Sequence, residues 1–329
     1  MKFLGIDGGG TKTEFIIINE LGMILGHTIK PTCHYKQTSL ENFEQVIREG
    51  IEEVCRLSDI SISNIDFIVA GIPGYGEIQN DVYIIDEIVK SILRNTSFIC
   101  VNDAVVAWAG SLACQPGINI VAGTGAIGYG IDSKGNVARS SGWGPFCGDE
   151  GSAYWLGKKV IEIFSKQSDG RLKKTPLYDI VSSEFNLKSE FDLLDIVVNN
   201  MEMKRDNVAQ LAKLLYRAAE VNDEFALEAY IQAAYEHYLT IHSIIDKLDF
   251  ETEERILVSY SGGVFNAGEY ILAPLKRFLQ KESKTIELIT PIMKPAFGAA
   301  LYALTIKMGR QNTDVIKNLI VQQEKQGVN

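Results

Sequence analysis

The chain has 329 residues, of which 46% are hydrophobic and 22% are charged, with 29 Gly and 8 Pro. This composition is typical of a globular protein and excludes a disordered or fibrous chain, and a length of two times about 150 residues suggests two domains. Lys and Arg number 32 while Asp and Glu number 42, giving a net charge of −10. That excess of acidic residues argues against nucleic acid or an anionic membrane as a partner.

The cysteines and the apolar stretches indicate where the protein resides. Five cysteines are scattered along the chain without a C-x-x-C pair, as expected of reduced thiols in a cytosolic protein. Only one short apolar run precedes Asp7, so we expect no signal peptide. The stretch from Ala104 to Ile131 has no charged residue, but Gln115-Pro116-Gly117 divides it. It therefore predicts a buried helix end, a turn and a strand, and we expect a cytoplasmic protein without a membrane partner.

The first part of the chain predicts a hairpin followed by alternating helices and strands. Apolar runs at Lys2 to Ile6 and Thr13 to Asn19 flank a glycine turn, and a third strand is expected at Met23 to His27. The spacing of apolar residues then predicts a helix around 43–54, a strand at 67–70, a helix at 82–93, a strand at 97–101 and a helix at 104–112.

The same order of strand, glycine turn, strand, turn and strand returns at 117–122, 127–131 and 136–139. This internal repeat predicts two related halves facing one site. Residues 154–249 are mostly helical in pattern, and the strand 255–260 is followed by a helix that continues to Leu279. The tail predicts one more helix from Pro295 and a polar end, 322–329, that we expect to fray.

The turn from Asp7 to Thr13 has the sequence DGGGTKT, in which backbone N–H groups can form a concavity that binds an anion such as phosphate. Two hydroxyl groups and one lysine add donors, and Asp7 at the strand end could hold Mg²⁺ directly or through water. The alternative is a tight hairpin without a ligand. The candidate phosphate contacts are Gly9, Gly10, Thr11, Lys12 and Thr13.

A second glycine turn, Gly123 to Gly128, matches G-x-G-x-x-G after a strand. A dinucleotide-binding fold would need a helix to begin there, whereas Tyr129 to Gly135 indicates a strand that runs into a turn. We therefore interpret Gly123, Thr124 and Gly125 as a second phosphate-binding turn. No Walker sequence occurs, which excludes a P-loop enzyme.

Asn102-Asp103 follows an apolar strand, and ligands of α/β sheets gather at the carboxyl ends of strands. Asp103 is thus placed to accept the proton of an attacking hydroxyl, as a catalytic Asp does in phosphoryl transfer. The alternative is that Asp103 is the N-cap of the following helix.

The segment from Gly142 to Ser152 combines Trp143 with the adjacent acids Asp149 and Glu150 on a glycine-rich loop. An apolar ring face beside hydrogen-bond acceptors suits a sugar. Alternatively, the acids and Ser152 cap the following helix and Trp143 lies in the core. The four histidines lack metal-ligand spacing and are expected to be structural or solvent-facing.

Together these residues resemble the sugar kinase, heat-shock ATPase and actin superfamily, and within it the BadF/BcrA-type group that includes N-acetylglucosamine kinase. The resemblance implies an α/β fold of two ribonuclease-H-like domains with an interdomain cleft that closes around ATP and a sugar. The domains implied are 1–112 and 113–294, the second with a helical insertion, and the helix at about 295–310 returns to the first. The motifs that carry it are DGGGTKT at 7–13, ND at 102–103, AGTGAIG at 122–128, GWGPFCGDEGSAYWLG at 142–157 and SGGVF at 261–265.

Roles follow from this resemblance position by position. It implies that Thr11 and Thr124 contact the nucleotide phosphates, that Gly262 and Gly263 form the turn on the adenosine side, and that Asp103 is the general base. The positions that resemble sugar contacts are Asn102, Asp103, Gly142, Trp143, Gly144, Asp149 and Glu150. Cys33 stands where relatives carry a sugar-binding Asn and cannot offer the same amide hydrogen bonds. Glucosamine, N-acetylmuramic acid and N-acetylglucosamine therefore all stay open.

The function expected is transfer of the γ-phosphoryl group of ATP, with Mg²⁺, to a hydroxyl of an amino sugar, O6 being favoured, by a homodimer. One alternative is the ATPase activator of a radical acyl-CoA dehydratase, which needs an iron–sulfur cluster that these cysteine spacings do not favour. Another is a non-catalytic sugar sensor, although sugar-responsive repressors of related fold carry an N-terminal helix-turn-helix and often a zinc-binding cysteine cluster.

Overall fold

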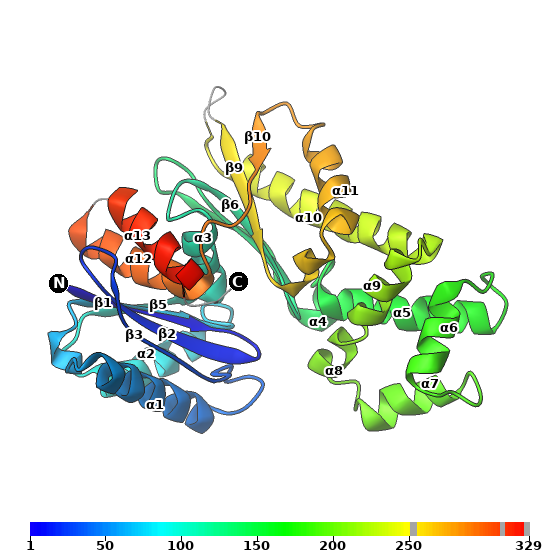
Figure 1. Cartoon of the computed structure of the whole chain (residues 1–329), viewed down its shortest axis with the longest axis horizontal. Helices are drawn as coiled ribbons and strands as arrows, with labels where there is room; N and C mark the ends of the chain where they lie inside the picture. The colour runs from blue at the N-terminus through cyan, green and yellow to red at the C-terminus, as the bar shows by residue number, and fades with distance from the viewer. Residues whose placement is uncertain (251–254, 310–312, 326–329) are drawn as a thin grey trace. The chain divides into compact units, whose positions relative to one another are not determined.

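The computed structural model describes residues 1–250, 255–309 and 313–325. The chain divides into two compact units, residues 1–119 with 289–329 and residues 120–288, and each unit contains a five-stranded sheet (Figure 1). The first boundary lies inside strand β6 (Gly117–Ala122), close to the 112/113 boundary that the sequence indicated. Because the chain crosses back at residue 288, the C-terminal helices belong to the first unit.

The sheet of the first unit has the order β3-β2-β1-β4-β5. Antiparallel pairing joins the first three strands, and β4 and β5 continue the sheet parallel to β1. The predicted hairpin and third strand are confirmed, with the third strand continuing to Pro31. The strands are β1 (Lys2–Gly8), β2 (Lys12–Asn19), β3 (Ile24–Pro31), β4 (Phe67–Ile72) and β5 (Phe98–Asn102).

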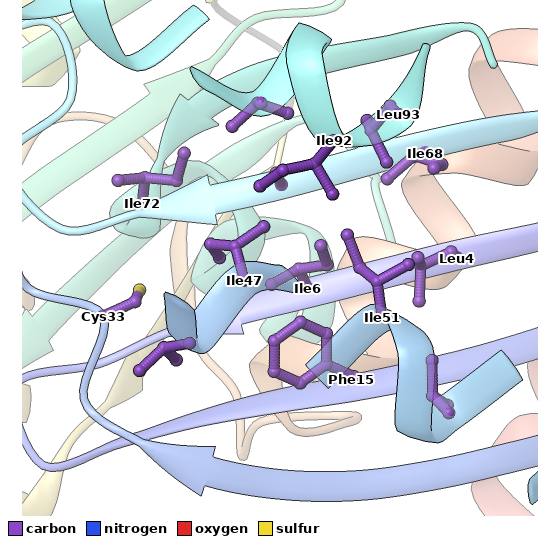
Figure 2. Close-up of a cluster of buried hydrophobic side chains, with 14 of the residues drawn as sticks. Leu4, Ile6, Phe15, Cys33, Ile47, Ile51, Ile68, Ile72, Ile92 and Leu93 are labelled. Carbon is purple, nitrogen blue, oxygen red and sulfur yellow. The ribbon is translucent and has the colours of Figure 1, made fainter. Parts of the chain in front are cut away.

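Helices cover both faces of this sheet because successive residues of a strand point to opposite sides. Leu4 and Ile6 face Ile47 and Ile51 of α1 in the core shown in Figure 2. Gly5, between them, lies against α12, where a Cβ would come within 2.2 Å of the backbone nitrogen of Ala300. The helices of this unit are α1 (Leu40–Ser58), η1 (Ile62–Asn64), α2 (Gln79–Leu93), α3 (Asp103–Ser111), α12 (Pro295–Met308) and α13 (Thr313–Lys325).

The polar end of the chain is more ordered than its composition suggests. Residues 322–325 close helix α13, and the side chain of Gln322 donates to the carbonyl of Gly22 and accepts from the amide of Ile24 at 2.8 Å each. The expectation that the tail frays is therefore wrong for 322–325, because the side chain of Gln322 satisfies backbone hydrogen-bonding groups of the β2–β3 turn. Residues 326–329 lie outside the described part of the chain.

The sheet of the second unit has the order β10-β9-β6-β7-β8, which repeats that of the first unit strand for strand. The predicted internal repeat is confirmed. The strands are β6, β7 (Ala126–Ile131), β8 (Val137–Ser141), β9 (Ile256–Ser261) and β10 (Ile286–Leu288), the last of which the sequence analysis missed.

Helices fill the second unit between β8 and β9, as the pattern of residues 154–249 predicts. The longest of them, α10, packs on β7 and β8, where Gly128 leaves room for Thr240 and Ile244. None of the described helices is long and apolar enough to cross a membrane. The helices are α4 (Gly144–Cys147), α5 (Ala153–Ser168), α6 (Pro176–Glu184), α7 (Asp192–Asp195), the π-helical turn η2 (Ile196–Asn200), α8 (Arg205–Ala209), α9 (Ala212–Glu220), α10 (Glu224–Lys247), η3 (Gly263–Ala267) and α11 (Glu269–Leu279).

Candidate active site

Two carboxylates meet at one edge of the first sheet. Strands β1, β4 and β5 are parallel, so Asp7 at the end of β1 and Asp103 just after β5 lie at the same edge. Burial raises the pKa of Asp7 to about 7, and the negative charges of Glu14 and Asp103 add to this effect. The prediction that Asp7 and Asp103 lie at the ends of strands is therefore confirmed. With a pKa of about 7, Asp7 takes up a proton near neutral pH when no cation is bound.

Helix α3 begins at Asp103, but its N-cap is Asn102. The side-chain oxygen of Asn102 accepts from the amide of Ala104 at 3.0 Å, and its side-chain nitrogen donates to the carbonyl of Tyr75 at 3.0 Å. The capping role considered for Asp103 therefore belongs to its neighbour. The side-chain oxygen and nitrogen of Asn102 each make one hydrogen bond to the backbone, which fixes this residue at the start of the helix, and its role as a sugar contact stays a prediction.

The glycines of the first turn allow close packing and are not needed for left-handed backbone angles. Gly8, Gly9 and Gly10 all avoid the left-handed region, and the amide of Gly9 donates to the carbonyl of Lys12 at 2.8 Å. A Cβ on Gly8 would lie 2.6 Å from the sulfur of Cys33. The exposed part of the turn consists of Gly10, Thr11 and Lys12, which are the residues accessible to a ligand.

Thr13 does not share this exposure. Its buried hydroxyl donates to the carbonyl of Pro31 at 2.9 Å and accepts from the amide of Cys33 at 2.9 Å. The prediction that Thr13 contacts phosphate is corrected accordingly, because both hydrogen bonds hold the segment after β3. Cys33 itself is fully buried and burial raises its pKa to about 12, so the thiol packs against Gly8 in neutral form.

An ionic cluster that the sequence analysis missed lies behind the first turn. Glu14, only 2% exposed, accepts from Nζ of Lys12 at 2.7 Å and from Nε2 of His27 at 2.9 Å. Burial alone would raise the pKa of Glu14, but the hydrogen bonds from His27 and Lys12 outweigh it and lower the pKa. Lys294, before α12, interacts electrostatically with both Glu14 and Lys12. The sequence feature that could have revealed this cluster is Glu14, an acid within the otherwise apolar run of β2.

The second glycine turn, in the second unit, is held by the helix that follows the loop. The amides of Ala153 and Tyr154 donate to the carbonyls of Gly123 and Thr124 at 2.9 and 3.3 Å. These bonds fix the turn at the start of α5. A Cβ on Gly123 would meet no described atom within 4 Å, so this side of the turn is open.

Gly262 and Gly263 come to the same turn from a distant part of the sequence. Gly262 has a φ of 99°, and a Cβ there would lie 2.4 Å from the carbonyl oxygen of Ala122. Only glycine allows this approach. A Cβ on Gly263 would have no described atom within 4 Å. The structure thus joins the two segments predicted to bind the nucleotide within this unit.

Asp149 is buried rather than exposed on its loop. It is 2% exposed, one carboxylate oxygen accepts from the amide of Ala126 at 3.3 Å, and the other pairs with Nη2 of Arg205 at 2.5 Å. Burial raises the pKa of Asp149 although Arg205 opposes this shift. Ser152 caps α5 by accepting from the amide of Trp155 at 3.1 Å, so the capping alternative is confirmed for Ser152 and is wrong for Asp149.

Two aromatic side chains project from the loop before α5. Trp143 is 78% exposed and Phe146 is 99% exposed, so the alternative that Trp143 lies in the core is wrong. Gly142 and Gly144, on either side of Trp143, have φ values of 74° and 82°. Glu150 is half-buried on the same loop. This loop therefore offers an accessible aromatic face and an acid.

Three of the four histidines pack against glycine or pair with acids. Within the described ranges, no group of three or more His, Cys, Asp or Glu side chains could hold a metal ion. His237 is buried against Gly151, and burial lowers its pKa to about 4. His27 and His242 pair with the acids Glu14 and Glu282. These contacts are the structural roles expected of His27, His237 and His242.

Comparison with known proteins places this geometry in a family. The chain is 31% identical to the N-acetylmuramic acid/N-acetylglucosamine kinase of Clostridium acetobutylicum over 92% of its own length and 98% of that protein. It is 29% identical to the N-acetyl-D-glucosamine kinase of Dictyostelium discoideum over 93% and 98% of the two chains.

The fold has a counterpart among solved structures. The crystal structure of a candidate N-acetylglucosamine kinase from Chromobacterium violaceum matches with a TM-score of 0.71 and 24% identity, covering 92% of this chain and 98% of that one. The predicted α/β fold with two ribonuclease-H-like domains is confirmed. Residues 4–303 match the model of the BadF/BadG/BcrA/BcrD ATPase family, and the protein belongs to that family.

Proposed function

We propose that this chain is an ATP-dependent kinase that transfers the γ-phosphoryl group to a hydroxyl, O6, of an amino sugar such as N-acetylglucosamine, glucosamine or N-acetylmuramic acid. The observation that carries the proposal is the pair of acids Asp7 and Asp103 beside an exposed Gly-Thr-Lys turn. The names of the two curated relatives supply the substrate class.

Asp103 is the general base of the proposed reaction. Its carboxylate accepts the proton of the acceptor hydroxyl as the oxygen attacks the γ-phosphorus, and the bond to the β-phosphate oxygen breaks to release ADP. Support comes from its position after a parallel strand and from Asn102, which takes over the capping of α3. Asp103 is therefore not needed as the cap.

The nucleotide contacts proposed are, in the first unit, Gly9, Gly10, Thr11 and Lys12, and, in the second unit, Gly123, Thr124, Gly125, Gly262 and Gly263. The residues fit a triphosphate because the first turn exposes a hydroxyl and an ammonium group and the second turn is open at Gly123. ATP supplies the phosphoryl group, while the protein positions it and excludes water.

Asp7 is the residue proposed to hold Mg²⁺, directly or through water. Magnesium binds nucleotide phosphates with one or two carboxylates and keeps several of its waters, so a single acid beside the turn fits it. The like charges around Asp7 favour a cation there. When bound, the ion neutralises charge on the phosphates.

For the sugar, Trp143 offers an apolar face, and Asp149 and Glu150 are the proposed acceptors on a loop shaped by Gly142 and Gly144. Asp149 is positioned by Arg205, and the buried Cys33 contributes packing rather than an amide contact. The homodimer and the cytoplasmic location stay predictions, and light scattering after size-exclusion chromatography tests the first.

The dehydratase-activator alternative gains no support from the cysteines. None of the five forms a disulfide, all lie in described residues, and only Cys147 is exposed. An iron–sulfur cluster between subunits would need closely spaced cysteines, and the five cysteines of this sequence are at least 14 residues apart.

The proposal is tested by coupled measurement of ADP release over a panel of amino sugars, with glucose as a non-amino control. We expect turnover with at least one amino sugar, and ³¹P NMR of the product should give a 6-phosphate. Sugar binding without ADP release for every sugar would favour the sensor instead. Asp103→Asn is compared with Asp59→Asn, a matched variant at an exposed position of the same unit where Asn is also tolerated.

A further inference from the structure

Arg205 occupies a position in the second unit that sequence reasoning did not single out. It begins the short helix α8, and its guanidinium pairs with the buried carboxylate of Asp149. A Cβ on Gly125 would lie 2.0 Å from Nη2 of Arg205. The guanidinium therefore rests directly on the second glycine turn, and a glycine at position 125 is what leaves room for it.

The hydrogen bonding of Arg205 is incomplete. A guanidinium carries five N–H donors. Nη2 donates to Asp149, but Nε is buried and has no hydrogen-bond partner among the described residues. Buried donors are nearly always satisfied in proteins, so a donor left open beside a turn calls for an acceptor that is not part of the described chain.

The chemistry of the site limits which ligand could bind there. Arginine binds phosphate oxygens through its planar fork and keeps its charge at every physiological pH. The side chain is 29% exposed, so the guanidinium is shielded but not sealed from a ligand. Its carboxylate partner is buried and accepts from the amide of Ala126, directly after the turn, so Asp149 holds the guanidinium against the turn.

We propose that Arg205 is a further binding residue of this protein, whose guanidinium contacts oxygens of the β- or γ-phosphate of the nucleotide at the turn 123–125. Asp149 positions it by fixing one end of the guanidinium. This inference rests on the proposed nucleotide site, but it assigns a residue from the helical insertion to that site. Gly125 and Arg205 act as a pair, because a larger residue at 125 would displace the guanidinium.

The test is calorimetric titration of the whole chain with a non-hydrolysable ATP analogue, AMPPNP, in the presence of Mg²⁺, and separately with AMP and with N-acetylmuramic acid. The variants are Arg205→Met and Arg205→Lys, and the matched control is Arg217→Met, which removes an arginine paired with Glu184 at an exposed site of the same helical region. Since Arg205→Met leaves Asp149 buried without its partner, the double variant Arg205→Met/Asp149→Asn is measured as well.

Arg205→Met should weaken AMPPNP binding about 10- to 100-fold, while AMP binding changes less than about 2-fold, because AMP lacks the β- and γ-phosphates. Arg205→Lys should fall between Arg205→Met and the unmodified chain, the double variant should match Arg205→Met, and Arg217→Met should change neither affinity. Circular dichroism confirms folding of each variant.

Three outcomes overturn the inference: unchanged AMPPNP affinity in folded Arg205→Met, an equal loss for AMP, or a loss confined to binding of N-acetylmuramic acid, which would assign Arg205 to the sugar carboxylate. Failure of the kinase proposal looks different. The unmodified chain would then bind AMPPNP in an Arg205-dependent way and yet release no ADP with any amino sugar.

Discussion

The two glycine turns of this protein have the same place in the same strand order but different electrostatic surroundings. The first turn, 7–13, is surrounded by acids, with Asp7, Glu14 and Asp103 close enough to interact. The second, 122–128, contains no charged residue and has Arg205 resting on Gly125. The repeated topology thus supplies two similar turns, and the side chains around them differ: acids lie beside the first turn, and an arginine lies on the second.

The largest effect is expected at the acidic turn. Asp103→Asn removes the proposed proton acceptor and should lower kcat at least about 10²-fold, because general-base help is lost while the shape of the side chain is kept. The KM for ATP and the thermal unfolding midpoint should stay near those of the unmodified chain. Retention of near-normal turnover by this variant would remove Asp103 from the mechanism.

The second turn is probed through its ion pair. Asp149→Ala leaves Arg205 without a partner and should lower the free energy of unfolding by about 2 to 4 kcal/mol. This cost lies at the lower side of the range for buried pairs because Arg205 is partly exposed. Urea unfolding followed by circular dichroism measures this. Glu184→Ala, which removes the acid of the exposed pair with Arg217, should cost less than about 1 kcal/mol. Equal costs for the two variants would contradict the account of a buried clamp.

The pH dependence of stability separates the two turns further. The pKa of Asp7 is raised from 3.8 to about 7, so below pH 3.8 the carboxyl is protonated in both the folded and the unfolded chain. Between pH 3.8 and about 7 the unfolded chain releases this proton and the folded chain keeps it, so this group lowers stability as pH rises.

Asp7→Asn removes that loss. Its unfolding midpoint, measured without Mg²⁺ by differential scanning calorimetry, should rise relative to that of the unmodified chain as the pH increases from about 4 to about 8. A difference that stays constant over this range would show that Asp7 ionises normally. Asp59→Asn, at an exposed position, serves as the control and should show no such trend.

The smallest effect concerns the lysine of the first turn. Glu14→Gln keeps the size of the side chain but loses the charge that holds Lys12 and His27, so the KM for ATP should rise about 3- to 10-fold with little change in kcat. Steady-state kinetics measure both constants. Glu44→Gln, at an exposed pair on α1, is the control. A fall in kcat with unchanged KM would assign Glu14 a role in the chemical step instead.

The strands and helices, and the edge that carries Asp7 and Asp103, were predictable because hydrophobic periodicity and strand ends are local properties of the sequence. The partners of individual side chains were not. Thr13 looked like a phosphate contact because nothing in the sequence reveals that its hydroxyl holds the backbone at Pro31 and Cys33. Likewise Arg205, 56 residues after Asp149, joins it only through the packing of α8 on α5.

The central claim, that Asp103 primes the acceptor hydroxyl, is tested most directly by a crystal structure with an ATP analogue, Mg²⁺ and the amino sugar that gives the highest turnover. The account predicts a carboxylate oxygen of Asp103 within about 2.6 to 3.2 Å of the acceptor hydroxyl, on the side away from the γ-phosphorus. A sugar bound with its reactive hydroxyl turned away from Asp103 would contradict it.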